Sequence, residues 1–195
     1  MAIRAGKQNI PCICVTNRTL CRDDFLTRID HIAKKGVADA ILLREKDLTE
    51  REYLELAEKG LTELRNPVVH RMFPGSRRCI LHTYYKAAKE LGCKEIHLPL
   101  PLLQKMREEG EKEWFTTVGT SVHSLKQANL AMHLQADYMT AGHIFETDCK
   151  KGLPGRGLSF LSKVVCKSEV PVYGIGGISA DNAGQIMETG AAGVC

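Results

Sequence analysis

Residues 170–195 read VPVYGIGGISADNAGQIMETGAAGVC, and this stretch holds one full period of the pattern that decides the fold. The apolar run Val170–Ile175 predicts a buried strand, and the glycines after it predict a tight turn. The spacing of the next apolar residues favours a helix over Ala180–Thr189, and Ala192–Cys195 begins another strand. A strand, a helix and a second strand without a hairpin signal form the βαβ unit of a parallel sheet.

The same alternation extends over the rest of the chain. Capping boxes at Thr49/Glu52 and Ser124/Gln127 predict two helix starts. Repetition of about eight units favours the α/β class and a single (β/α)8 TIM-barrel domain over residues 1–195, with an open doubly wound sheet as the alternative. Strands are predicted at 10–15, 40–43, 79–81, 96–98, 115–118, 137–140, 170–175 and 192–195, and helices at 23–35, 49–64, up to 91, 102–109, from 124, 158–166 and 180–189.

The eighth unit is incomplete in this sequence. The chain stops at Cys195, inside the predicted eighth strand, and no eighth helix follows. Because a barrel closes through its last strand, we expect a barrel that is truncated in its eighth βα unit.

The composition narrows the class of partner. The chain is 44% hydrophobic and 26% charged, and its net charge of +4 is spread along the sequence. This suits a small anionic ligand and argues against nucleic acid. The densest basic stretch, Arg71, Arg77 and Arg78, fits a solvated loop as well as a phosphate site. No apolar run approaches the roughly 20 residues of a membrane span, so no membrane association is expected.

The eight cysteines indicate free thiols. They form neither paired C-x-x-C units nor a zinc-site spacing. Cys12 and Cys14 alternate on a predicted strand, and we interpret them as small buried hydrophobic residues. Since Met1–Asn9 lacks the apolar segment of a secretion signal, the expected location is the reducing cytoplasm.

Two glycine-containing loops follow predicted strands, where a parallel barrel carries its active site. Gly176 and Gly177 let backbone N–H groups approach a phosphate at the start of a helix. The long loop Gly142–Gly157 adds the cations Lys150, Lys151 and Arg156 and the hydroxyl of Thr147. A ligand-free turn and a flexible solvent lid are the structural alternatives for these loops.

His123 follows the fifth predicted strand, in the segment Gly119–Ser124. Histidine is the side chain best suited to moving protons near neutral pH, so His123 is a candidate acid/base. A lone histidine in a loop is more often a surface residue or a cap, and spacing alone does not decide between these roles.

At these motifs the sequence resembles the thiamin phosphate synthase/TenI superfamily. The shared motifs occur in the same order over nearly the whole chain: Val15–Arg18, Leu43–Lys46, Gly119–Ser124, Gly142–Lys151, Gly174–Ile178 and Gly190–Val194. The resemblance implies a (β/α)8 barrel that acts on thiazole phosphates. One branch, the synthase, couples a pyrimidine pyrophosphate to a thiazole phosphate with Mg²⁺. The other branch, TenI, is a metal-free thiazole tautomerase.

The positions that carry Mg²⁺ ligands in the synthase differ in this chain. His82 and Thr83 stand where the synthase has an Asn-Asp pair, and Pro99-Leu100-Pro101-Leu102 replaces its second acidic motif. Leu42 matches a glutamine near the pyrimidine. Mg²⁺ requires hard oxygen ligands, which these residues do not supply. On this ground we expect no metal and no cofactor, and we rank the transferase below the tautomerase.

The resemblance to TenI assigns the site residues of the expected tautomerase. His123 is the proton shuttle that aromatises a carboxythiazole phosphate. The thiazole phosphate is the expected small-molecule partner, and a homo-oligomer is left open. The residues expected to bind it are Ser121, Thr147, Lys150, Gly176 and Gly177 around the phosphate. Arg44 and Lys46 are expected to face the carboxylate, a role that is our own inference and is not assigned by the resemblance.

Three alternatives to the tautomerase are kept. The first is thiamin phosphate synthase, a transferase. The second is a non-catalytic protein that binds or senses a thiamin-pathway metabolite, which the incomplete eighth unit favours. The third is an unrelated phosphate-binding barrel of the indole-glycerol-phosphate type, against which the distinctive loop Gly142–Gly157 argues.

Overall fold

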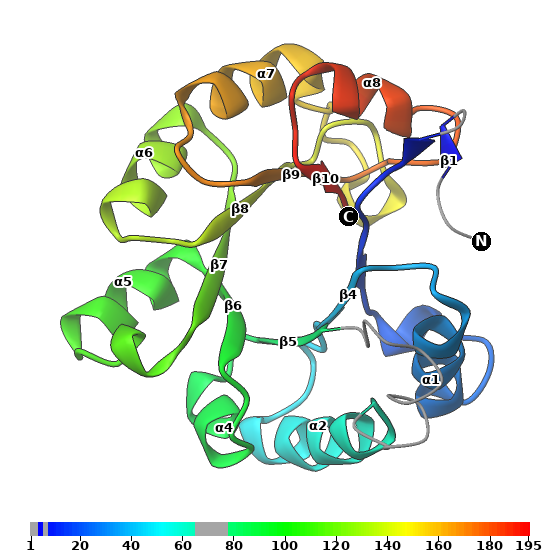
Figure 1. Ribbon diagram of the computed structural model, residues 1–195, viewed down its shortest axis with the longest axis vertical. Helices are drawn as coiled ribbons and strands as arrows, with labels where there is room; N and C mark the ends of the chain where they lie inside the picture. The colour runs from blue at the N-terminus through cyan, green and yellow to red at the C-terminus, as the bar shows by residue number, and fades with distance from the viewer. Residues whose placement is uncertain (1–3, 6–7, 65–77) are drawn as a thin grey trace. The chain divides into compact units, whose positions relative to one another are not determined.

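The predicted alternation of strands and helices is present in the computed structural model (Figure 1). The structure describes residues 4–5, 8–64 and 78–195, with side chains for residues 10–60 and 79–195. The predicted basic loop around Arg71 and Arg77 lies outside the described residues. The described chain groups into two compact units, Ile13–His97 and Leu98–Cys195, the second of which also includes the segment that ends at Cys12.

The first unit is built on parallel strands in the consecutive order β3, β4, β5, β6. Their apolar residues form the core of the unit, with Ile41 and Leu81 fully buried. Figure 1 shows α1, α2 and α4 along the outer side of these strands. The elements are β3 (Ile13–Val15), η1 (Arg18–Leu20), α1 (Phe25–Lys35), β4 (Ala40–Leu43), α2 (Glu50–Leu64), β5 (Arg78–His82), α4 (Tyr85–Glu90) and β6 (Glu95–Pro99).

The second unit repeats this arrangement with the parallel order β7, β8, β9, β10. Met139 and Ile186 are among its fully buried side chains. The elements are α5 (Leu100–Glu108), η2 (Lys112–Trp114), β7 (Thr117–Val122), α6 (Leu125–His133), β8 (Tyr138–Gly142), η3 (Asp148–Lys150), α7 (Gly157–Lys167), β9 (Val172–Ile175), α8 (Ala183–Glu188) and β10 (Gly193–Val194).

The strand order supports the predicted fold class. A doubly wound open sheet reverses its strand order at a switch point, whereas a (β/α)8 barrel keeps chain order. Both units keep chain order, and all of their strands are parallel. The α/β prediction and its barrel form therefore agree with the order seen within each unit.

Two local predictions are wrong. The fifth strand is β7 at Thr117–Val122 rather than 115–118, because Phe115 packs edge-on against Trp114 of η2, with ring centroids 4.8 Å apart. The chain also contains a hairpin, in which β1 (Arg4–Ala5) pairs antiparallel with β2 (Gln8–Asn9). This polar segment is too short to show the apolar alternation by which strands are recognised.

Among the described helices, none is both long enough and apolar enough to cross a membrane. Cys12 and Cys14 are half-buried rather than fully buried, and burial raises the pKa of the Cys14 thiol.

Candidate functional site

In the first unit, β4 is followed by Arg44, Glu45 and Lys46, of which Glu45 is buried. Its two carboxylate oxygens accept hydrogen bonds from the Thr16 hydroxyl at 2.6 Å and the Arg18 N–H at 2.9 Å. The Thr16 hydroxyl also accepts from the Arg44 N–H at 2.9 Å. Both carboxylate oxygens of Glu45 are therefore engaged, and its two neighbours in this segment, Arg44 and Lys46, are cations.

His82 and His97 are paired in the register of the neighbouring strands β5 and β6. Their buried rings stack with centroids 5.7 Å apart and an interplanar angle of 14°. Burial, helped by His97, Arg44 and Lys46, lowers the pKa of His82 to about 2. Burial, helped by Arg44 and Lys46, lowers the pKa of His97 to about 3. Both imidazoles are therefore neutral near pH 7, and the positive charges of Arg44 and Lys46 further disfavour their protonation.

Tyr53 and Thr83 hold this region in place. The buried Tyr53 hydroxyl donates to the Leu43 carbonyl at 2.7 Å and accepts from the His82 N–H at 2.8 Å, which joins β4 to β5. Thr83 has a φ of 69°, and its hydroxyl lies 2.5 Å from His82 Nδ1. A β-branched residue is strained in this left-handed region, and such strain tends to occur at functional sites.

We call Arg44, Lys46, His82, Thr83 and His97 the strand-end cluster. Its residues do not fit the Mg²⁺ that the resemblance implies for a synthase. Mg²⁺ is bound through oxygen ligands, usually one or two carboxylates together with phosphate oxygens. The cluster supplies cations, neutral imidazoles and one hydroxyl instead. Within residues 10–60 and 79–195, no group of three histidine, cysteine or acidic side chains could hold a metal ion.

In the second unit, two loops run side by side after β8 and β9. The Ile144 N–H donates to the Ile175 carbonyl at 2.9 Å, and the Phe145 N–H donates to the Gly176 carbonyl at 3.0 Å. Gly177 has a φ of 66°, and a Cβ atom there would lie 2.3 Å from the Glu146 carbonyl oxygen. Only glycine satisfies both conditions. We call residues 142–157 and 175–179 the paired loops.

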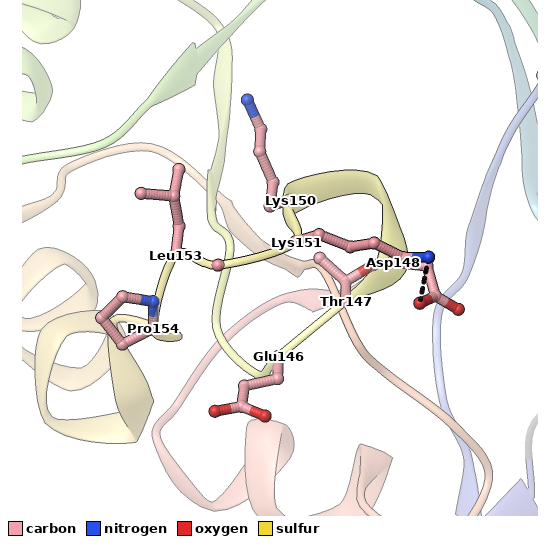
Figure 2. Close-up of a pocket in the computed structure, with 8 residues that line it drawn as sticks. Glu146, Thr147, Asp148, Lys150, Lys151, Leu153 and Pro154 are labelled. Carbon is pink, nitrogen blue, oxygen red and sulfur yellow. Dashed lines mark ion pairs between the residues drawn. The ribbon is translucent and has the colours of Figure 1, made fainter.

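The first of the paired loops lines a cavity of about 770 Å³ between Glu146 and Pro154 (Figure 2). Thr147 begins the turn η3, and its carbonyl accepts from the Lys150 N–H at 2.9 Å. Lys151 pairs with Asp148 at 3.8 Å, whereas Lys150 points away from that pair. This exposed lysine has no ion-pair partner in the described part of the chain, so its charge is available to an anionic ligand.

His123 is the first residue after β7 and is exposed. Its Nδ1 lies 2.7 Å from the Gly142 carbonyl, which also accepts from Arg156 Nε at 3.0 Å. A carbonyl oxygen only accepts, so Nδ1 carries the proton and Nε2 is the basic nitrogen of the neutral ring. This geometry prepares Nε2 to accept a hydrogen bond from a ligand.

The predicted site residues are divided between the units. Arg44 and Lys46 lie in the first unit, and the others lie in the second. Ser121 is on strand β7 rather than in a loop, and its hydroxyl accepts from the Thr140 hydroxyl at 3.0 Å. Asn182 was missed: its side chain donates to the Gly177 carbonyl at 2.9 Å and accepts from the Ser179 N–H at 2.8 Å. A helix was predicted over Ala180–Thr189, but the contact of Asn182 with the glycine turn has no signal in the sequence.

Parallel βα units with cations and glycines at the ends of their strands define a barrel-type protein suited to small anionic ligands. The family model described as thiamine monophosphate synthase matches residues 12–195, and the chain belongs to this family. The thiamin phosphate synthase/TenI resemblance is therefore confirmed at the level of the superfamily.

Comparisons with individual relatives support the same family. The chain is 32% identical to a thiamine-phosphate synthase of Syntrophomonas wolfei over 92% of its length and 82% of the relative. It is 31% identical to a thiamine-phosphate synthase of Pyrococcus furiosus over 83% of its length and 74% of the relative. The solved thiamine phosphate pyrophosphorylase of Pyrococcus furiosus has a TM-score of 0.73 and 26% identity, covering 95% of this chain and 84% of that one. This likeness confirms the TIM-barrel fold class.

These relatives contradict the predicted tautomerase and its isomerase class. Each carries the name of a synthase or pyrophosphorylase, which is a transferase, and the similarity extends over most of the chain. The tautomerase prediction gave more weight to a few replaced residues, such as Thr83 and Pro99, than to this chain-wide similarity. The expected closeness to TenI has no support in these comparisons.

Proposed function

We propose that the chain is a thiamine-phosphate synthase. This transferase joins a pyrimidine pyrophosphate to a thiazole phosphate and releases pyrophosphate. The observation that carries the proposal is about 30% identity to relatives of that name over most of the chain. Two features of the structure support it, the cationic strand-end cluster and the glycine-rich paired loops.

The paired loops are the proposed grip on the thiazole phosphate. Lys150 supplies a positive charge, and the Thr147 hydroxyl can donate a hydrogen bond to the same anion. The glycines at positions 176 and 177 pack closely against residues 143–146. We propose that their backbone N–H groups bind the phosphate oxygens. Ser121 lies at the end of β7 and is proposed to contact the ligand.

The strand-end cluster is the proposed site of the pyrophosphate group. Arg44 and Lys46 counter the negative charge that accumulates as pyrophosphate leaves, which lowers the barrier to its departure. This role replaces the contact with a substrate carboxylate that was expected for a tautomerase.

His123 remains a proposed site residue. The proton shift assigned to it no longer applies, because that reaction belongs to the tautomerase. Its fixed tautomer still leaves Nε2 as a hydrogen-bond acceptor beside β7. We propose that Nε2 positions a donor group of a bound substrate.

The experiment is a coupling assay with the two substrates, in which thiamine phosphate is measured directly. Lys150→Met removes the proposed phosphate contact, and we expect the affinity for thiazole phosphate to fall about tenfold or more. The matched control is Lys163→Met, which removes an exposed lysine on α7 and should leave the reaction unchanged. Thiazole phosphate binding with no product would overturn the proposal in favour of a non-catalytic metabolite-binding protein.

A further inference from the structure

We infer that the strand-end cluster binds pyrophosphate directly, through its own cations and imidazoles, without a bound divalent cation. This inference rests on the proposed function for the choice of ligand, and it deepens that function by stating how the site handles the charge. It is argued from the chemistry of the side chains that follow β4 and β5 and of His97 within β6.

The two carboxylates beside Arg44 and Lys46 in the sequence, those of Glu45 and Asp47, already have partners. Glu45 is held by Thr16 and Arg18, as described above. Asp47 forms an ion pair with the Arg18 guanidinium. Neither carboxylate is therefore arranged to complete a cation site, while Arg44 and Lys46 contribute two positive charges to the same region.

The histidine pair makes the binding of Mg²⁺ in this cluster even less favourable. His82 and His97 are buried side by side, and the Thr83 hydroxyl shares a hydrogen bond with His82 Nδ1. Neutral imidazole suits softer transition metals, whereas Mg²⁺ prefers carboxylate and phosphate oxygens. A neutral ring can instead donate its N–H to a phosphate oxygen.

The replacement of a metal by cations has a measurable consequence. Arg44 can pair with two phosphate oxygens through its planar guanidinium, and Lys46 adds a point charge. Mg²⁺ in solution neutralises part of the charge on pyrophosphate, so it competes with these side chains for the ligand. In a site that uses a metal, Mg²⁺ would tighten binding instead.

The test is calorimetric titration of the chain of residues 1–195 with inorganic pyrophosphate, in EDTA and in magnesium chloride. We expect binding in EDTA that Mg²⁺ leaves equal or weaker. Lys46→Met should weaken it about tenfold, the usual effect of losing one charged hydrogen-bond donor. Arg51→Met is the matched control, because Arg51 is an exposed cation paired with Glu55 on α2. Binding that requires Mg²⁺, or that is lost in Lys150→Met but kept in Lys46→Met, would overturn the inference.

A variant that is designed to depend on Mg²⁺ distinguishes a change in the binding site from a general effect on folding. Thr83→Asp places a carboxylate at the end of β5, where φ is 69° and an aspartate is better tolerated than a threonine. In this variant we expect Mg²⁺ to tighten pyrophosphate binding about tenfold relative to EDTA. An unchanged response to Mg²⁺ in Thr83→Asp would count against the placement of pyrophosphate beside Thr83.

The outcomes separate this inference from the proposed function. Metal-independent pyrophosphate binding without any coupling activity would keep the inference and reject the synthase. Coupling activity together with Mg²⁺-dependent pyrophosphate binding would keep the synthase and reject the inference.

Discussion

Among the described residues, Thr83 combines a β-branched side chain with a left-handed backbone. Its φ of 69° places a β-branched side chain in the left-handed region, which costs of the order of 1–3 kcal/mol. The sequence identifies Thr83 only as a replaced carboxylate, because backbone angles at a strand end depend on neighbouring strands. Its N–H donates to the His97 carbonyl at 3.1 Å, a contact that only the fold can create.

We therefore expect Thr83→Asn to raise the free energy of unfolding by about 1 kcal/mol, because asparagine tolerates a left-handed backbone. Urea denaturation of the variant and the parent protein measures this change. Gln135→Asn is the matched control, because Gln135 has a φ of 57° without β-branching and should gain less. A Thr83→Asn protein that is less stable than its parent would show that no strain is relieved there.

The residues of the candidate site were only partly accessible from sequence. Lys150 and Gly177 could be found because cations and glycines in a long loop have a direct chemical meaning. Tyr53 and His97 could not, because Tyr53 lies on a helix rich in charged residues, His97 lies within an apolar strand, and each acquires its role through packing. The Tyr53 hydroxyl joins Leu43 of β4 to His82 of β5, two residues that are far apart in the sequence.

At the scale of elements, the predicted helix starts were reliable because the two residues of a capping box are close in sequence. The capping box of α2 is present, since the Thr49 N–H donates to Glu52 at 2.8 Å and the Glu52 N–H donates to the Thr49 hydroxyl at 3.3 Å. The second box differs in detail, because Gln127 accepts from the His123 N–H at 2.6 Å rather than from the Ser124 N–H. The predicted fifth strand also ended too early, at residue 118, because Gly119, Thr120 and Ser121 resemble a loop in composition.

The contact between the paired loops predicts unequal effects of two glycine substitutions. Gly177→Ala adds a Cβ atom 2.3 Å from the Glu146 carbonyl and strains a φ of 66°, so we expect a loss of about 3 kcal/mol or more. Gly152→Ala has a similar φ of 79° but open space, so only the conformational cost of about 1 kcal/mol applies. Denaturant unfolding of both variants gives the difference, and equal losses would contradict the close contact of the loops.

At the scale of the whole molecule, the buried histidine pair links stability to pH. Both histidines have pKa values well below 6.5 in the folded chain, so the unfolded chain binds more protons below that pH. Stability is therefore fully present above about pH 6.5 and is lost as the pH falls towards the folded pKa values. When the pH falls from about 7.5 to about 5.5, protonation of the two histidines in the unfolded chain should lower the free energy of unfolding by about 2–3 kcal/mol.

Chemical denaturation at these two pH values measures this effect. His97→Gln should reduce the pH dependence by about half, since one of the two titrating groups is removed. His133→Gln is the control, because His133 lies at the surface end of α6 and should leave the slope unchanged. A parent protein whose stability is the same at both pH values would contradict the buried, neutral state of the pair.

The fold class and the superfamily were predictable from the whole sequence, because both depend on a repeated pattern and on motifs in a fixed order. The reaction was not. Thr83 and Pro99 stand at positions where the resemblance implies Mg²⁺ ligands in the synthase. The tautomerase prediction treated the replacement of these ligands as evidence against the synthase activity itself. The strand-end cluster offers a different physical account, in which Arg44 and Lys46 carry the charge of the pyrophosphate.

The most direct test of this account is product analysis by mass spectrometry after the purified chain is incubated with the pyrimidine pyrophosphate and the thiazole phosphate. The account predicts thiamine phosphate and an equal amount of released pyrophosphate. Intact substrates after prolonged incubation with the folded protein, in EDTA and in magnesium chloride alike, would contradict it.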